Sequence, residues 1–438
     1  MKSINQARSI LEKLISMVKT GDAQVEYSYG DTTSMRFGDN AITQNSVGES
    51  GEVSIEIAID GRRGCASTNR FDDESLRRIF DRARTIAKQS PPDPEYMPPV
   101  EPCEYPEMPQ RYFDETTKLS PDEIAEHISI VTEMAASKGY RAGGLYQSGA
   151  TLNAIANNRG LFAFDRFTHV EYSCSVAGPT GSGYNSASSE SIDRIDPEAL
   201  ARRAFGSAVA AQDPVDIEPG EFTVVLMPQA VIDLLEYFTY YMSRRDADEG
   251  TTAFAGKLGK KIFSDMVNIH VGAPDQEMPP PQFGNDGLPT RHTHWVRDGV
   301  LERLPMSRYW AKKMGDSPDA IEWPFSMTGQ NKSIDELVSE CGRGLLVRRF
   351  WYIEEVDARE MLLTGMTRDG LFKIENGEVT HPVKNLRFNE SPMVVLANIV
   401  ASGSPKRLST YFNEPPYFAK VPAILATDFT FDSKTESM

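Results

Sequence analysis

A proline-dense segment is the strongest constraint that this sequence places on its fold. Residues 89–115 include the run SPPDPEYMPPVEPCEYPEMPQRY, which is acidic as well as rich in proline. Proline fixes φ and has no backbone N–H to donate, so the segment cannot form a regular helix or a central strand. We therefore expect an extended arm or linker here, with folded elements before and after it.

The residues before this arm predict a helix, a meander of short strands and a second helix. Residues 1–19 place apolar side chains on one stripe of a helix and interrupt them with charges. Apolar and polar residues then alternate up to and beyond the tight turn Asp60-Gly61. Asp72 is expected to begin the second helix, because acids are favoured in the first turn. The expected strands are 24–30, 34–39, 42–50 and 51–68.

The residues after the arm predict a central module of hairpins and helices. Ser120 and Pro121 have the chemistry of a helix start, and a second capped helix is expected over 196–212. Between these helices, strand hairpins should turn at residues 157–160. The glycine-rich run GPTGSGYNS, residues 178–186, lacks the Lys-Ser/Thr pair of a phosphate-binding loop, so we expect a mobile surface loop.

The second half of the chain is rich in strand signals. Strands are expected within 342–356, 359–388 and 421–431, with tight turns at 368–370 and 375–378. The predicted fold class is α+β. An N-terminal α/β strand-and-helix region should precede a C-terminal β-rich, barrel-like domain. The expected divisions are an N-terminal module at 1–112, a central module of the same region at 113–217, and a C-terminal domain at 218–438.

Charge and cysteine usage narrow the class of protein. A net charge of −17 argues against a general nucleic-acid binder, since the longest basic cluster is the interrupted run Arg343–Arg349. The four cysteines lack CxxC spacing, which is typical of buried free thiols in a reducing compartment. No apolar run approaches the length of a membrane span or a signal peptide. We therefore expect a cytoplasmic protein.

Residues 220–259 combine a strand, a proline-started helix and the glycine-rich turn GTTAFAG. This layout resembles the TldD/PmbA (TldD/TldE) family of peptidases and peptidase-like partners. The pattern GxxGCASTN at 61–69 and the segment TGxTRDG…IENGEVxxPVKN at 364–385 are similar to the same family. The resemblance covers nearly the whole chain.

The resemblance also implies that the zinc-binding residues of this helix are replaced. In the TldD branch it carries His-Glu-x-x-x-His, in which both histidines bind zinc and the glutamate acts as base. An ungapped count from the glycine-rich turn places these positions at Leu235, Glu236 and Tyr240. The third zinc ligand of the family is a cysteine near the C-terminus, and none follows Cys341. The chain therefore resembles the TldE/PmbA-like branch without zinc ligands, and no cofactor is expected.

Two candidate sites remain open at the level of sequence. Glu236 is either an ordinary helix residue, solvated or paired, or a vestigial base that works without a metal. His292 and His294 form a His-x-His pair, and with His270 they are the alternative metal site.

The resemblance favours a non-catalytic TldE-like subunit that pairs with a TldD-like subunit or with itself. Peptidases of the family take unfolded or extended peptides as an added strand, a mode that could outlast the zinc. The alternatives are an active metallopeptidase with a non-standard or partner-supplied metal, and a non-enzymatic peptide-binding protein.

Overall fold

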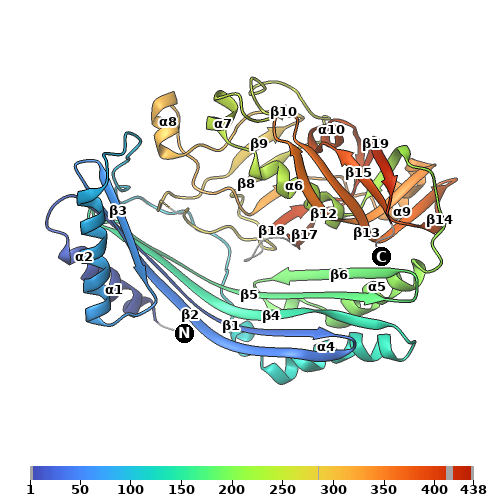
Figure 1. Ribbon diagram of the computed structural model, residues 1–438, viewed down its shortest axis with the longest axis horizontal. Coiled ribbons are helices and arrows are strands. Elements are labelled where there is room, and N and C mark those ends of the chain that lie inside the picture. The colour runs from blue at the N-terminus through green and yellow to red at the C-terminus, as the bar shows by residue number, and fades with distance from the viewer. Residues whose placement is uncertain (1–2, 285, 411–417, 436–438) are drawn as a thin grey trace.

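The computed structural model describes residues 3–284, 286–410 and 418–435. The first half of the chain forms one antiparallel six-stranded sheet in the order β3-β2-β1-β4-β5-β6 (Figure 1). Its strands lie on both sides of the proline-rich arm in the sequence, so the expected N-terminal and central modules share a single sheet. The strands are β1 Asp22–Gly38, β2 Ala41–Ile59, β3 Arg62–Thr68, β4 Arg141–Asn157, β5 Phe162–Ala177 and β6 Ser182–Ser189.

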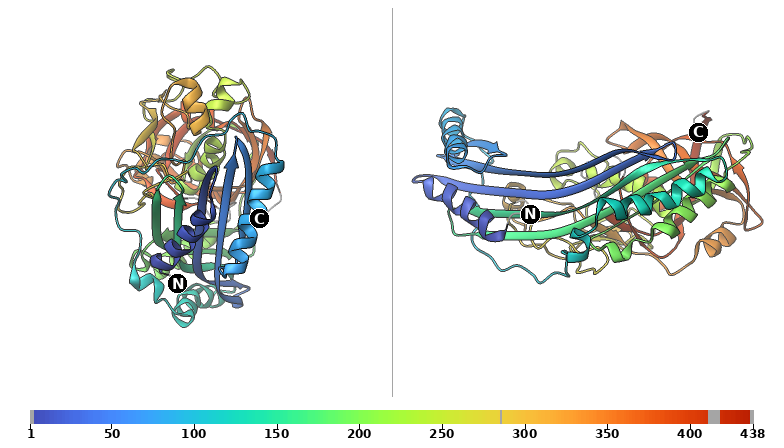
Figure 2. Two further views of the ribbon diagram at one scale, coloured as in Figure 1. Left: turned by 90° about the vertical axis from the view of Figure 1, so that its left-hand side faces the viewer. Right: turned by 90° about the horizontal axis from the view of Figure 1, so that it is seen from below.

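The prediction of short N-terminal strands was wrong. β1 and β2 are continuous over 17 and 19 residues, and together they form one long curved hairpin (Figure 2). The polar residues at 31–33 suggested a break between two strands because they interrupt the apolar alternation. The ladder continues through them because β1 stays paired with β4 from Gln24 to Phe37.

Four helices cover one face of this sheet at its two ends. α1 (Ile4–Met17) and α2 (Asp73–Gln89) pack over one end, and α4 (Pro121–Ala136) and α5 (Pro197–Ala210) pack over the other. The predicted caps are confirmed at Asp72 and at Ser120, which forms a full capping box. The opposite face of the sheet turns toward the C-terminal half of the chain (Figure 1). Two short elements complete this region, α3 Asp114–Thr117 and η1 Ile192–Arg194.

The prediction of a mobile loop at 178–186 was also wrong, because Ser182–Ser189 is the edge strand β6. Its glycines permit close packing rather than motion. A Cβ added at Gly183 would lie 2.4 Å from the carbonyl oxygen of Ala204 in α5, so only glycine lets the strand approach this helix.

The proline-rich arm contains no helix or strand from Ser90 to Phe113, as predicted. It is fixed to the C-terminal half by hydrogen bonds. The Tyr105 hydroxyl donates to the carbonyl oxygen of Gly287 over 2.9 Å, and Arg308 donates to that of Pro98. The arm is therefore an ordered strap between the two halves.

Five strands of the C-terminal half close into a ring, which confirms the barrel-like prediction. β12, β7, β19, β15 and β13 pair in that order, and a β12–β13 pairing closes the circle. β14 and β16 extend it at the sides. These strands are β7 Gly220–Leu226, β12 Gly344–Asp357, β13 Leu362–Glu375, β14 Glu378–Val383, β15 Leu386–Glu390, β16 Ile399–Ser402 and β19 Ile424–Lys434.

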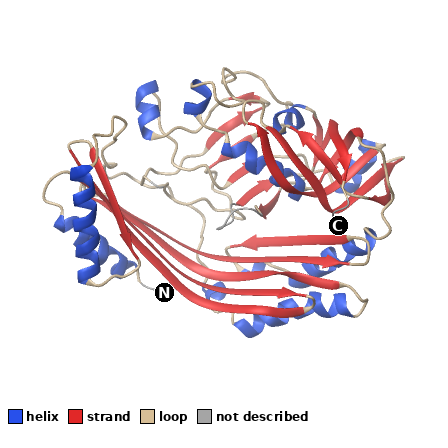
Figure 3. Ribbon diagram, viewed as in Figure 1, coloured by secondary structure: helices blue, strands red, loops and turns tan. Residues whose placement is uncertain are grey.

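A second, mixed sheet adjoins this ring in the order β10-β9-β8-β11-β18-β17. Its strands are β8 Ile269–Val271, β9 Thr293–Arg297, β10 Val300–Leu301, β11 Phe325–Met327, β17 Lys406–Ser409 and β18 Phe418–Val421. The helices of this half are short (Figure 3). They are α6 Pro228–Tyr240, α7 Arg244–Asp248, α8 Arg308–Met314, α9 Ile334–Cys341 and α10 Pro392–Ala397. None of the described helices is long and apolar enough to span a bilayer.

One of the two predicted C-terminal turns is confirmed. Asn376 and Gly377 have φ of 53° and 77° and join β13 to β14. The other, at residues 368–370, is instead a distortion inside β13, where Asp369 has φ of 56°. Its side chain is 4% exposed, so the distortion carries a carboxylate into the interior.

Candidate functional site

The helix that resembles the zinc-binding helix of the family is α6, which packs against β12 and the core of the C-terminal half. Leu235 is 2% exposed and belongs to that core, whereas Tyr240 is 80% exposed. Glu236 lies between these extremes and is half-buried rather than fully solvated. Leu235 and Tyr240, which the ungapped count assigns to the histidine positions, therefore lie in opposite environments, one inside the protein and one in solvent.

A buried charge cluster that the sequence did not predict includes one residue of the same helix. Asp233 of α6, Arg349 of β12 and Asp369 of β13 are all at most 4% exposed. A guanidinium nitrogen of Arg349 lies 3.6 Å from Oδ2 of Asp369, and the positive charge of Arg349 also acts on Asp233. Asp233 accepts hydrogen bonds of 2.9 Å from the side chain of Gln229 and the backbone N–H of Phe350. The cluster thus ties α6 to two strands of the barrel.

The cluster also reaches the N-terminal sheet through β6. The Ser182 hydroxyl donates to Oδ1 of Asp369 over 2.6 Å. The guanidinium carbon of Arg349 lies 4.2 Å from the centre of the Tyr184 ring, a cation–π contact. α6, the barrel and the N-terminal sheet therefore meet at Arg349.

Burial changes the acidity of both carboxyl groups of α6. It raises the pKa of Asp233 to about 6, although the Arg349 charge and two hydrogen bonds oppose the rise. It raises the pKa of Glu236 to about 7, with a further contribution from the charge of Asp233. A carboxyl group with such a pKa exchanges protons near neutral pH, the property expected of a general acid or base. Desolvation in the apolar core is by itself enough to raise the pKa of a carboxyl group to this range, without any catalytic role.

Glu236→Gln is expected to reduce the loss of stability as pH rises. The folded-state pKa of Glu236 is raised from 4.5 to about 7, so its protonated form stabilises the fold below pH 4.5, and this contribution is lost as pH rises through about 7. Glutamine cannot ionise. Urea midpoints at about pH 5 and about pH 8 should therefore differ less in the variant than in the wild type. If the midpoint changes by the same amount between the two pH values in the variant and in the wild type, the pKa of Glu236 is not raised by folding.

The sequence held a signal for this cluster. Asp233 interrupts the apolar run VIDLLEYF, and an acid on the core side of a helix needs a buried partner. Asp369 belongs to the TRDG segment that resembles the family, but was interpreted as a turn residue. Arg349 ends the basic run 343–349, which is not a continuous surface patch because Arg349 is 2% exposed. Burial also lowers the pKa of Arg348 in the same run.

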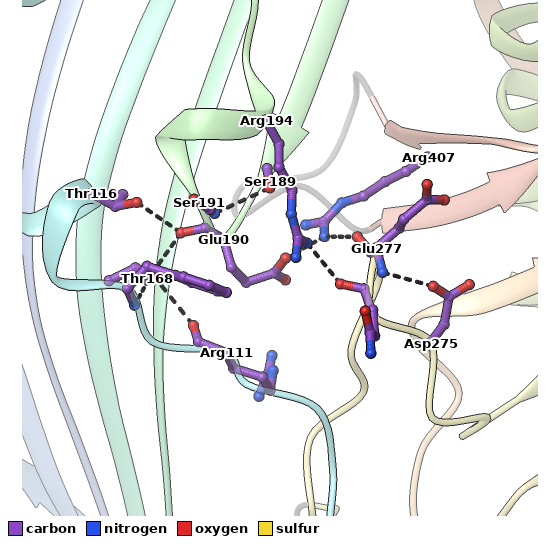
Figure 4. A network of polar contacts seen from close by, with 12 residues as sticks. Arg111, Thr116, Thr168, Ser189, Glu190, Ser191, Arg194, Asp275, Glu277 and Arg407 are labelled. Atoms are coloured by element: carbon purple, nitrogen blue, oxygen red, sulfur yellow. Dashed lines mark hydrogen bonds and ion pairs between the residues drawn. The ribbon is translucent and has the colours of Figure 1, made fainter.

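A second polar network joins the two halves of the chain beside β6 (Figure 4). Glu190 directly follows β6, and its carboxylate forms a 2.5 Å ion pair with Arg407 of β17. The two side chains are only 7% and 8% exposed. The backbone oxygen of Glu190 accepts hydrogen bonds from the hydroxyls of Thr116 and Thr168. These two hydrogen bonds fix the backbone of Glu190, which anchors the acidic partner of the ion pair to the N-terminal sheet.

Further contacts surround this ion pair. Arg407 also donates to the backbone oxygen of Glu277 over 2.7 Å. Arg194 donates to the backbone oxygen of Gln276 over the same distance, so the 275–277 loop is held from both halves. Lys420 of β18 forms ion pairs of 2.8 and 2.6 Å with Asp275 and Glu277.

The three histidines of the alternative metal site do come together. The ring centres of His270, His292 and His294 lie 4.8 to 5.5 Å apart, because β8 pairs with β9 and places His270 opposite His294. Burial, and then the two neighbouring imidazoles, lower the pKa of His270 to about 4, which keeps it neutral at physiological pH. Across the described ranges, however, no group of three or more His, Cys, Asp or Glu is arranged to hold a metal ion.

The cysteines are less uniform than expected. Cys174 is buried, but Cys65 and Cys103 are exposed, so the prediction of buried thiols was wrong for these two. Cys65 lies in β3, where the alternation places its side chain on the uncovered face. All four cysteines are free thiols.

Comparisons with known proteins agree with this architecture. Family models of the PmbA/TldA metallopeptidases match three successive segments: domain 1 at residues 23–87, the central domain at 116–212 and the C-terminal domain at 219–433. The metalloprotease PmbA of Escherichia coli O157:H7 is 23% identical over 436 residues, which cover 92% of this chain and 94% of that protein.

Two solved structures share the fold over nearly their full length. The TldE structure from Thermococcus kodakarensis has a TM-score of 0.88 at 18% identity and covers 98% of this chain and 100% of its own. A protein from Thermotoga maritima described as a putative modulator of a DNA gyrase has a TM-score of 0.85 at 19% identity, covering 97% and 100%. From the three family matches and these relatives, the chain belongs to the TldD/PmbA family of metallopeptidases and related proteins.

Proposed function

We propose that this chain is a TldE-like subunit, which has no zinc site of its own and supports peptide binding and proteolysis within a complex. The observation that carries the proposal is the environment of Leu235 and Tyr240. Leu235 offers no donor atom and is buried in the apolar core, and the Tyr240 phenol lies in solvent. Zinc in a catalytic site needs three donors from imidazole, thiolate or carboxylate. The residues at the family's zinc positions do not fit the metal.

The rest of the fold supports a role that does not require a bound metal. The curved sheet, the closed barrel and the buried polar junctions between them are all present. Extended peptides bind to such sheets as added strands through backbone hydrogen bonds, a mode that needs no metal. A TldD-like subunit would supply the zinc, and this chain would supply part of the surface that holds the peptide. Glu236 then has no direct role in cleavage.

A second candidate function is an active metallopeptidase that uses His270, His292 and His294. The observation that favours it is the close approach of the three imidazole rings. Against it stands the lack of a nearby carboxylate or thiolate in a metal-binding arrangement among the described residues. A peptide-binding protein without a peptidase partner is the third possibility.

Co-expression with a TldD-like protein that retains His-Glu-x-x-x-His is expected to yield a co-purifying complex that degrades unfolded peptides. This chain alone should not cleave them. Glu236→Gln in this chain should leave activity of the complex nearly unchanged, whereas the same replacement in the TldD-like subunit's own motif should abolish it. Cleavage by this chain alone, or a 100-fold loss of activity in Glu236→Gln, would contradict the proposal, since a loss of that size is typical of removing a general base.

A further inference from the structure

The outward side of α2 carries a dense group of positive charges. The apolar residues of the helix, among them Ile79 and Ala83, are buried against the sheet, and its charged residues are exposed. Asp81 is the only acid from residue 77 to residue 88, whereas five exposed cations fall within this range. We call these five residues the basic face: Arg77, Arg78, Arg82, Arg84 and Lys88.

The basic face is not neutralised by the rest of the protein. Neighbouring charges do pair, Lys13 with Asp73 and Arg70 with Asp72, but within the described part of the chain no cation of the basic face forms an ion pair. The helix dipole favours a cation in the last turn, which accounts for Lys88 but not for the arginines before it. A local excess of positive charge therefore remains in a chain of net charge −17.

The fold holds this charge in place at one end of the molecule. A Cβ added at Gly64 of β3 would lie 2.2 Å from the carbonyl oxygen of Ala83, so α2 packs directly on the strand. α2 lies at the end of the sheet away from the C-terminal barrel (Figure 1). Salt screens charges over about 8 Å at physiological ionic strength, so distant acids of this chain do not cancel the basic face.

Three cations of the basic face form a row along the helix. Arg84 and Lys88 follow Arg77 by 7 and 11 residues. In an α-helix these positions lie within about 40° of one another around the axis and span about 16 Å along it. About five residues of an extended chain cover the same length, and their alternate side chains point to one side. An extended segment with acids at alternate positions can therefore contact the whole row.

We propose that the basic face of α2 is a docking surface for an acidic, extended segment of a partner polypeptide. Charge complementarity selects an anionic partner, and the shape of the surface selects a narrow one. The acids at 72–74 in the first turn limit the basic area, and a broad anionic surface would also approach them. No exposed residue from 77 to 88 is apolar, so the face lacks the side chains that insert into a membrane. The inference goes beyond the proposed function, since it requires neither zinc nor a TldD-like subunit.

Fluorescence anisotropy of the purified chain with a labelled peptide tests this surface. The probe is a short peptide in which Glu alternates with Ser, and its counterpart has Gln in place of each Glu. The wild type should bind the Glu peptide in preference to the Gln peptide, and added salt should weaken the binding because exposed ion pairs are screened.

Arg77→Gln combined with Arg84→Gln and Lys88→Gln should weaken binding of the Glu peptide at least about tenfold, because three ion pairs are lost together. Glutamine has a helix propensity close to that of arginine and lysine, so circular dichroism should show a folded protein. Replacing the same three residues by Glu should reverse the preference, so that this variant binds a peptide in which Lys alternates with Ser.

The matched control is Lys118→Gln with Lys138→Gln and Lys312→Gln, which removes the same charge from exposed positions outside α2. It should bind the Glu peptide as the wild type does. A wild type that does not prefer the Glu peptide, or equal binding by the α2 variant and the control, would overturn the proposal. Tighter binding to vesicles of phosphatidylglycerol and phosphatidylcholine, or to single-stranded DNA, that is lost in the α2 variant would overturn a polypeptide as the occupant.

Discussion

Arg349→Met is expected to destabilise the protein by about 3–5 kcal/mol, the range for removing one partner of a buried ion pair. Arg349 is 2% exposed and is the cation between Asp233 and Asp369. Methionine keeps much of the side-chain volume, but it removes the buried cation beside both carboxylates and leaves Asp369 with only the more exposed Arg368, 3.9 Å away. Urea unfolding at neutral pH measures the loss, and the midpoint should fall without a change in slope.

Two further variants isolate the cause of this loss. Arg368→Met removes a neighbouring arginine that is 3.9 Å from Asp369 but whose side chain is 35% exposed, so it should cost less than about 1 kcal/mol. Adding Asp369→Asn to Arg349→Met should recover part of the stability, because one buried charge is removed. If the double variant is as unstable as Arg349→Met alone, the loss comes from packing and not from unpaired charge.

Arg407→Met is expected to have a loss of similar size at the other polar junction. It leaves Glu190, 5% exposed, without a cation and removes the hydrogen bond to the 275–277 loop. Because this ion pair joins the N-terminal sheet to the mixed sheet, the two halves should also come apart more easily. Limited proteolysis of the folded variant should cut between the halves faster than in the wild type.

Lys406→Met is the matched control for Arg407→Met. Lys406 is the exposed neighbour on the same strand, so its replacement removes a positive charge without uncovering a buried acid. It should stay within about 0.5 kcal/mol of the wild type. Combining Arg407→Met with Glu190→Gln should recover part of the loss. Equal effects of Arg407→Met and Lys406→Met would contradict a role for the buried ion pair.

Features of the fold with local causes could be predicted from the sequence. The caps at Asp72 and Ser120 depend on a side chain and a backbone N–H three residues away. The turn at Asn376-Gly377 depends on two residues that tolerate positive φ. The absence of helix and strand in the proline-rich arm follows from the fixed φ and the missing backbone N–H of each proline. Each of these predictions is confirmed because no distant partner is needed.

Features that depend on a distant strand could not be predicted. β1 and β2 run through polar residues because β4, more than 100 residues later, continues the ladder beside β1. The strand expected at 42–50 is present, but the sequence did not show that it is continuous with the residues after it as β2, because neither face of 41–50 is covered. β6 is a strand because its glycines let α5 approach, although the same glycines suggested a loop.

The candidate site was predicted only in part, for the same reason. The His-x-His pair placed two imidazoles together, and the assignment of Leu235, Glu236 and Tyr240 by position counting stays a prediction. The sequence named His270 beside that pair but not the β8–β9 pairing that brings it there, and it did not predict that Asp233, Arg349 and Asp369 meet. These contacts join residues that lie far apart in the chain, and only the closed barrel brings them together.

Zinc content is the most direct test of the claim that this chain has no catalytic metal site of its own. The purified protein, dialysed against metal-free buffer and measured by elemental analysis, should hold far less than one zinc per chain. A TldD-like subunit with intact His-Glu-x-x-x-His, treated in the same way, should retain its metal and serve as the control. One tightly held zinc per chain in the protein described here would contradict the claim, and its loss on replacing His270, His292 and His294 would locate the site.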